Sequence, residues 1–142
     1  MSLKDSLCAV ELFCELPDDL VEEMIARGST VEVGPGHPFV RQGDAGGGML
    51  MLVHGTADVA VDGRPVRTLS TGDYFGEMSL IDGAERSATV TSGPEGATAF
   101  RLSPAALTDL IAKHPHTAVL LLKGLVTRVR ELESRAGDAT RG

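Results

Sequence analysis

The chain has 142 residues, with no tryptophan, one tyrosine and only two cysteines. Cys8 and Cys14 have a spacing that matches no zinc or redox pair. Two thiolates are also too few to hold an iron–sulfur cluster. We therefore expect no metal centre at these positions and interpret both cysteines as small, buried or half-buried thiols on an N-terminal helical segment.

Positive charge and long apolar runs are scarce as well. Lys and Arg number 13 against 20 acidic residues, so the net charge is −7, which argues against a nucleic-acid surface. Apolar runs such as 118–122 are far too short to cross a bilayer, and residues 1–8 lack the order of a signal peptide. We expect a cytoplasmic protein of one domain, in which any anionic ligand is held by local groups.

Catalytic signals are missing from the sequence. No nucleophile is paired with a base, so we expect no enzymatic activity. The four histidines (His37, His54, His114 and His116) fall in turns. A cupin-like metal enzyme is the alternative, because it would also be a small β-barrel with His and Glu ligands. Its run of closely spaced histidines and a glutamate on adjoining strands is absent, so we expect no metal and no cofactor.

The central part of the chain shows short β-like runs cut by glycine-containing turns, which is typical of a β-sandwich or roll. Strands are predicted at 30–33, 39–41, 49–53, 57–61, 66–69 and 97–102. Asp62-Gly63 is a suitable two-residue hairpin turn. Gly46-Gly47-Gly48 lacks the Lys-Ser/Thr and the helix of a phosphate loop, so it is interpreted as a flexible hairpin end.

Helical patterns flank this region. Apolar spacing predicts a helix within 3–13, and Pro17 opens a second helix that stops at Gly28. Ser103-Pro104 caps a helix to about Lys113. The final helix, about 117–134, carries an apolar stripe at Val119, Leu122, Val126 and Val129 that is wider than one small roll needs. A homodimer through this helix is predicted; the alternative is a helix folded fully onto its own domain.

The stretch 72–90, GDYFGEMSLIDGAERSATV, gathers groups that suit a phosphorylated sugar. Gly76 opens a short helix, whose unpaired N–H groups and positive dipole end attract an anion. Arg86 can give paired hydrogen bonds to phosphate oxygens, with the Ser87 hydroxyl beside it. Glu77 would repel a phosphate but can accept hydrogen bonds from sugar hydroxyls. Taken singly, each group has a purely structural alternative. Glu77 could complement the dipole of a helix start, Arg86 could be a solvated loop charge, and 87–90 could be an ordinary strand.

Together, Phe75-Gly76-Glu77 and Arg86-Ser87-Ala88 resemble the phosphate-binding cassette of the cyclic nucleotide-binding domain family. This sensor module occurs in catabolite activator-type regulators, cyclic-nucleotide-dependent kinases and gated channels. The resemblance covers about residues 10–135. It implies a mainly β fold with flanking helices, namely an eight-stranded antiparallel β-roll of the double-stranded β-helix, jelly-roll-like kind. The expected divisions are one domain over 1–135, with N-terminal helices in 1–28, the roll in 29–102, the cassette in 72–90, C-terminal helices in 103–135, and a polar tail in 136–142.

The resemblance also implies a ligand, cyclic AMP or cyclic GMP, and a set of contacts. Ligand-binding residues would be Phe75, Gly76, Glu77, Met78, Ser79, Arg86, Ser87 and Ala88. In the family the C-terminal helix covers the nucleotide and, in bacterial regulators, pairs with its twin, which implies base contacts from Arg128, Arg130 or Leu132. Serine at position 87 favours cyclic AMP over cyclic GMP.

The output of such a sensor is less defined. The bacterial regulators continue into a helix-turn-helix, whereas this sequence ends at Gly142, so we expect no direct DNA binding and an unidentified protein effector. The alternative is a degenerate fold that acts only as an interaction or dimerisation module.

Overall fold

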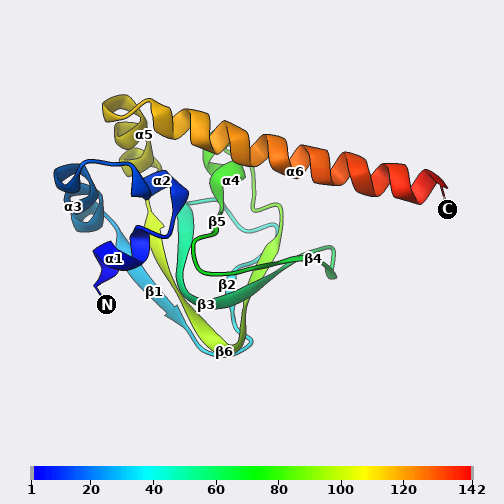
Figure 1. Cartoon of the computed structure of the whole chain (residues 1–142). Helices are drawn as coiled ribbons and strands as arrows, with labels where there is room; N and C mark the ends of the chain where they lie inside the picture. The colour runs from blue at the N-terminus through cyan, green and yellow to red at the C-terminus, as the bar shows by residue number, and fades with distance from the viewer. Residues whose placement is uncertain (1, 142) are drawn as a thin grey trace.

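The computed structural model describes residues 2–141 as six helices and six strands (Figure 1). The helices are α1 Leu3–Leu7, α2 Glu11–Cys14, α3 Asp18–Arg27, α4 Glu77–Asp82, α5 Pro104–Lys113 and α6 His116–Arg141. The strands are β1 Ser29–Val33, β2 Pro38–Val40, β3 Met49–Val61, β4 Arg64–Leu69, β5 Tyr74–Phe75 and β6 Thr89–Leu102.

The strands form one antiparallel sheet in the order β1-β6-β3-β4, in which β2 also pairs with β6 and β5 with β3. The fold is mainly β with flanking helices, as predicted, but the prediction of eight strands was wrong. Six strands are found in the described part of the chain, and they form no closed barrel. The predicted strands 49–53 and 57–61 are one strand, β3.

Glycines explain the merging of predicted strands. Gly55 and Gly96 both have positive φ, and a Cβ on Gly55 would lie 2.5 Å from the carbonyl oxygen of Gly96. The register of β3 and β6 shifts on either side of Gly55. The two long strands therefore bend together at a bulge and keep pairing, where a turn was expected. The Asp62-Gly63 hairpin is confirmed, with positive φ at both residues.

Successive residues of β3 supply two cores, because side chains alternate across a strand. Met49 and Met51 pack with the helices α1, α2, α3, α5 and the start of α6, whereas Leu50 and Leu52 pack inside the bent sheet. The first core fastens the base of α6 to the sheet, since Leu120 and Leu121 are buried in it. The rest of α6 extends past the sheet (Figure 1).

The helices differ from expectation mainly at the two ends of the chain. The predicted helix in 3–13 is two short helices, and Cys8 and Cys14 at their ends are exposed free thiols, which corrects the buried interpretation. Ser103 caps α5 by accepting a hydrogen bond from the Ala106 N–H at 3.2 Å, as predicted. Helix α6 continues beyond residue 134 through residues 136–141 of the predicted polar tail; Gly142 lies outside the described residues.

No helix within residues 2–141 is both long and apolar enough to cross a membrane. Within the same residues, no group of His, Cys, Asp and Glu side chains is placed to hold a metal ion.

Candidate functional site

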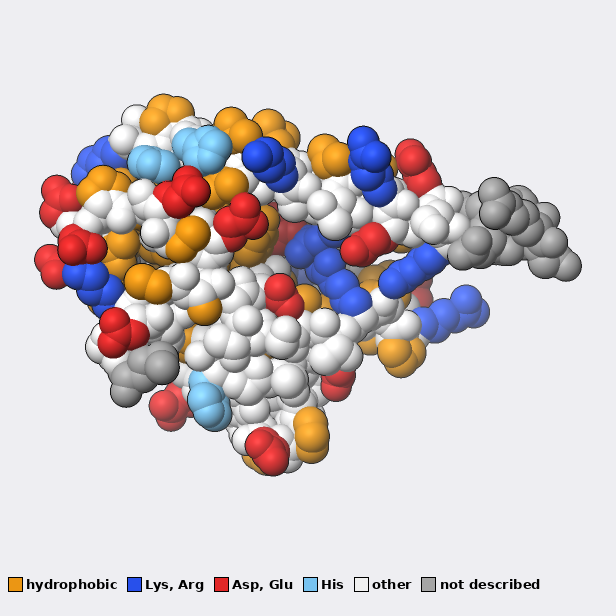
Figure 2. Space-filling model, in the orientation of Figure 1, with side chains coloured by type: hydrophobic (Ala, Val, Ile, Leu, Met, Phe, Trp, Pro, Cys, Tyr) orange, Lys and Arg blue, Asp and Glu red, His pale blue; other side chains and the backbone are white. Residues whose placement is uncertain are grey.

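A cavity of about 210 Å³ lies between the bent sheet, the start of α4 and the outer part of α6. Its lining is Val40, Val59, Val61, Val66, Arg67, Phe75, Gly76, Glu77, Met78, Ser79, Arg86, Ser87, Ala88, Val90, Arg128, Glu131, Leu132 and Arg135. The eight ligand-binding residues predicted from the cassette all line this one cavity. Figure 2 shows Lys and Arg side chains gathered beneath α6, where it passes over the strands.

Gly76 stands immediately before α4 with φ at 90°. A Cβ at this position would lie 2.5 Å from Nη1 of Arg86 and 2.7 Å from the carbonyl oxygen of Gly48. No side chain caps the first turn of α4. Glycine is therefore required here by both conformation and space, and its absence of a side chain leaves the start of α4 open to the cavity.

Arg86 is only 7% exposed, on the wall of the cavity. Its Nη1 donates to the carbonyl oxygens of Gly48 at 2.9 Å and Gly76 at 3.5 Å. Among the described residues, its Nε and Nη2 make no hydrogen bond. Burial, and then repulsion from Arg101, lowers the pKa of this guanidinium, so a nearby anion would favour its charged form.

The loop before β3 fixes the backbone of Arg86. The Arg86 N–H donates to the carbonyl of Asp44 at 2.8 Å, and the Gly43 N–H donates to the carbonyl of Arg86 at 2.9 Å. A Cβ on Gly46 would lie 2.4 Å from Cβ of Ser79. Gly46 is thus closely packed against the site. The run 46–48 lies between β2 and β3, which do not pair with each other, so its interpretation as a hairpin end was wrong.

Glu77, the first residue of α4, is 1% exposed. Its Oε1 accepts a hydrogen bond from Nη1 of Arg128, and Nη2 of the same arginine donates to the Tyr74 carbonyl at 3.3 Å. Its Oε2 is buried, with no hydrogen-bond partner among the described residues. A buried carboxylate oxygen without a donor is rare and costly in folded proteins.

The remaining cassette residues differ in their surroundings. Phe75 is buried beside Phe39, with ring centroids 5.7 Å apart. The buried Ser79 donates to the carbonyl of Glu85 at 3.2 Å, so its hydroxyl has an internal partner. Ser87 is exposed and lies 4.0 Å from the Met78 sulfur. Half-buried Ala88 completes this wall.

Helix α6 brings only some of its predicted contacts to the cavity. Leu132 lines it while 62% exposed, and Arg128 lines it while bound to Glu77. Arg130 is exposed and is not part of the lining. On a helix, residues two positions apart point to different sides, so Arg128 and Arg130 could not both face the cavity.

Sequence reasoning missed three charged lining residues. Arg67 lies on β4, and Glu131 and Arg135 lie on α6. Nη2 of Arg135 donates to the Val66 carbonyl at 3.1 Å, which connects the outer part of α6 to β4. Glu131 and Arg135 follow Arg128 at helical steps of three and four, a spacing that signals a shared face.

Comparison with known proteins agrees with this architecture. The family model of the cyclic nucleotide-binding domain matches residues 30–114, more than half of the chain. The chain belongs to this family. Its domain is a regulatory, non-catalytic fold, and the part matched by the family model includes the whole cassette.

Three similar proteins illustrate the range of the family. A cGMP-dependent protein kinase of Toxoplasma gondii is 40% identical over 87 residues, which are 61% of this chain and 9% of the kinase. A cyclic nucleotide-gated potassium channel of Rhizobium etli is 37% identical over 89 residues, 63% of this chain and 25% of the channel. The crystal structure of the Thermus thermophilus catabolite activator protein superposes with a TM-score of 0.75 at 29% identity, covering 86% of this chain and 59% of that one. The match thus spans a quarter or less of the first two proteins' lengths.

Proposed function

We propose that this domain is a cyclic nucleotide sensor that binds the cyclic phosphate through Arg86 and the start of α4 and the ribose through Glu77. The observation that carries the proposal is the unpaired, buried Oε2 of Glu77. A ribose hydroxyl would donate to this oxygen and relieve the cost of its burial.

A phosphate beside that ribose is supported by the surroundings of Arg86. Because its Nε and Nη2 make no hydrogen bond among the described residues, they remain available for phosphate oxygens. The open start of α4 adds backbone donors. The chain has a net charge of −7, so these local groups must supply the attraction for an anion.

The signal would pass through α6. Arg128 connects α6 to the ribose-binding carboxylate, so nucleotide binding at Glu77 changes the surroundings of the contact that holds the helix. A ligand shifts the helix only by its difference in affinity for the two arrangements. We propose that this movement is read by an as yet unidentified protein effector.

Dimer formation through α6 is part of the proposal. Val119, Leu122, Val126 and Val129 are between 42% and 60% exposed. They follow steps of three and four residues, on the opposite side of α6 from the lining residue Glu131. A second copy of this helix would cover the stripe as in a two-stranded coiled coil.

The base of the nucleotide can be proposed to be adenine or guanine. Matched proteins include kinases named for cyclic GMP and a regulatory subunit of a kinase named for cyclic AMP. Ser87 predicts cyclic AMP. The alternative function is a degenerate fold used only for interaction or dimerisation; an unpaired Glu77 oxygen and an available Arg86 favour a working site over it.

Calorimetric titration of the chain with cyclic AMP, cyclic GMP and their linear 5′-monophosphates tests the function. We expect binding of at least one cyclic nucleotide and much weaker binding of the linear forms, whose extra charge and freedom the site does not match. Arg86→Ala should abolish most of this affinity, while Arg41→Ala, an exposed arginine outside the cavity lining, should leave it unchanged. The absence of cyclic nucleotide binding in the wild type would favour the interaction module.

A further inference from the structure

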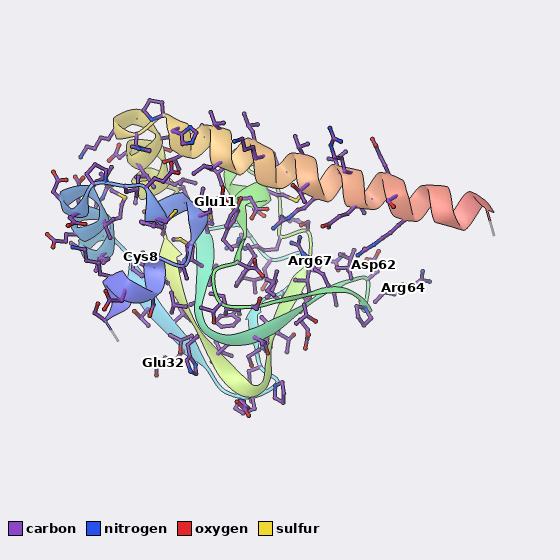
Figure 3. All side chains as sticks on the ribbon, in the orientation of Figure 1. Cys8, Glu11, Glu32, Asp62, Arg64 and Arg67 are labelled. Carbon is purple, nitrogen blue, oxygen red and sulfur yellow. The ribbon has the colours of Figure 1, made fainter. Side chains whose placement is uncertain are left out.

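One cation in the cavity has no hydrogen-bond or ion-pair partner within residues 2–141. Of the four arginines in the lining, Arg86 and Arg135 donate to backbone carbonyls and Arg128 pairs with Glu77. Arg67 makes no hydrogen bond and no ion pair with any residue that the structure describes. Figure 3 places Arg67 beneath α6, whereas Arg64 lies at the outer tip of the β3–β4 hairpin. The proposed phosphate and ribose contacts make no use of Arg67.

The surroundings of Arg67 are unfavourable for a charge without an acceptor. The side chain is half-buried, and burial followed by repulsion from Arg128 lowers the pKa of its guanidinium. Donors that lose water without gaining an acceptor cost free energy. The planar guanidinium of Arg67 can therefore donate two parallel hydrogen bonds to a ligand group that offers two acceptors.

Glu131 faces the same part of the cavity from α6. Its charge attracts Arg67, yet no ion pair joins the two side chains among the described residues. Both line the same cavity, the half-buried Arg67 from β4 and the exposed Glu131 from α6. The apolar side chains of Val59, Val61 and Val66 line the cavity as well. An apolar surface that also carries the guanidinium donors of Arg67 and the carboxylate acceptors of Glu131 suits the flat ring of a purine base.

The two purines present different edges to such a pair. Guanine offers two acceptors, O6 and N7, to an arginine, and its N1–H and 2-amino group donate to a carboxylate. Adenine instead offers N7 beside a 6-amino donor, which a guanidinium repels, and its N1 is an acceptor that a carboxylate repels. Both charged groups therefore favour guanine over adenine.

We infer that Arg67 and Glu131 select guanine, so that cyclic GMP is the preferred ligand of this domain. The inference rests on the proposed cyclic nucleotide site and identifies its base. It opposes the preference for cyclic AMP that Ser87 predicts, because the Ser87 hydroxyl lies near the Met78 sulfur, whereas Arg67 is half-buried and has no partner within residues 2–141.

Calorimetry with cyclic GMP, cyclic AMP and cyclic IMP tests the assignment. Cyclic IMP keeps O6, N7 and N1–H but lacks the 2-amino group, so it separates the two contacts. We expect the wild type to bind cyclic GMP about tenfold or more tightly than cyclic AMP, with cyclic IMP between them. Arg67→Ala should lower affinity for cyclic GMP and cyclic IMP by about tenfold and leave cyclic AMP nearly unchanged.

Matched variants complete the test. Arg64→Ala removes an exposed arginine of the same strand outside the lining, and Glu133→Ala removes an exposed glutamate of the same helix; both should keep the preference for cyclic GMP. Glu131→Ala should abolish the advantage of cyclic GMP over cyclic IMP.

Three outcomes would overturn the base assignment alone. They are equal binding of cyclic GMP and cyclic AMP by the wild type, a preference of the wild type for cyclic AMP, and an equal loss of affinity for both nucleotides in Arg67→Ala. Failure of the wild type to bind any cyclic nucleotide would overturn the proposed function with it.

Discussion

Arg128 donates to Oε1 of Glu77, a contact between side chains 51 positions apart that ties the C-terminal helix to the floor of the cavity. The same carboxylate leaves Oε2 buried and unpaired. One residue of the cavity lining thus binds the helix through one carboxylate oxygen, while its other oxygen has no partner among residues 2–141. In the proposed function, this single side chain connects ligand binding to the position of α6.

Glu77→Ala should weaken cyclic nucleotide binding on the order of 2 to 4 kcal/mol, or about thirtyfold or more in Kd, because the ribose hydroxyl loses its charged acceptor. Titration calorimetry measures the change. Glu85→Ala removes an exposed carboxylate near the same loop and should bind like the wild type. Wild-type affinity in Glu77→Ala would contradict the ribose assignment.

Arg128→Ala should loosen α6 in the ligand-free protein, because both of its hydrogen bonds to Glu77 and Tyr74 are lost. Faster amide exchange in the outer half of α6 would report this. Arg130→Ala removes an exposed arginine outside the cavity lining and should leave exchange unchanged. Equal exchange in both variants would show that Arg128 does not hold the helix.

Deletion of residues 128–142 should weaken nucleotide binding without abolishing it, because Arg86 and Glu77 remain while the cover over the base is removed. Binding and amide exchange are measured with and without nucleotide. Unchanged affinity in the deletion, together with no ligand-induced protection of α6 in the full chain, would exclude movement of α6 as the signal.

Gly76→Ala should destabilise the domain more than Gly83→Ala. Both glycines have positive φ, which costs an alanine roughly 1 to 2 kcal/mol, but a Cβ on Gly83 meets nothing within 4 Å. At Gly76 the Cβ would also collide with Arg86 and the Gly48 carbonyl, adding roughly 1 to 3 kcal/mol. Urea unfolding at constant m-value compares the two. Equal losses would mean that the site relaxes around the added methyl group.

Tyr74 is the one tyrosine of a chain without tryptophan, so the absorbance of its phenolate reports on this residue alone. Burial, with a contribution from nearby Glu77, raises its pKa. Burial of the neutral Tyr74 phenol therefore contributes to the free energy of unfolding. This contribution is fully present below the pKa of tyrosine in the unfolded chain, about 10, and is lost as pH rises through the pKa of Tyr74 in the folded chain. We expect the native chain to titrate above the urea-unfolded chain; a midpoint at or below the unfolded one would contradict this.

Leu122→Glu should convert a dimer into monomers if the exposed stripe of α6 is the interface, because it places a charge in an apolar seam. Sedimentation velocity measures the association state. Lys123→Glu, at an exposed neighbouring position off the stripe, should leave the dimer intact. A wild type that is monomeric at all concentrations would exclude a dimer through this helix.

Local patterns in the sequence were sufficient for the class of fold and for most of the cassette. The resemblance of Phe75-Gly76-Glu77 and Arg86-Ser87-Ala88 to the cassette predicted that the two motifs share one site, and all six residues line one cavity. The helix start at Ser103 and the Asp62-Gly63 hairpin were likewise predictable, because caps and two-residue turns are decided by the residues within them.

Tertiary structure alone decided the number of strands and added Arg67, Glu131 and Arg135 to the charged lining of the cavity. Gly55 could be a turn or a bulge, and only its pairing against Gly96 across β3 and β6 selects the bulge. Whether Arg67, Arg128 or Arg130 faces the cavity depends on where α6 passes over β4, which is set by burial of Leu120 and Leu121 in a distant core. Such long-range packing leaves no local signature, because a side chain acquires its partner from an element far along the chain.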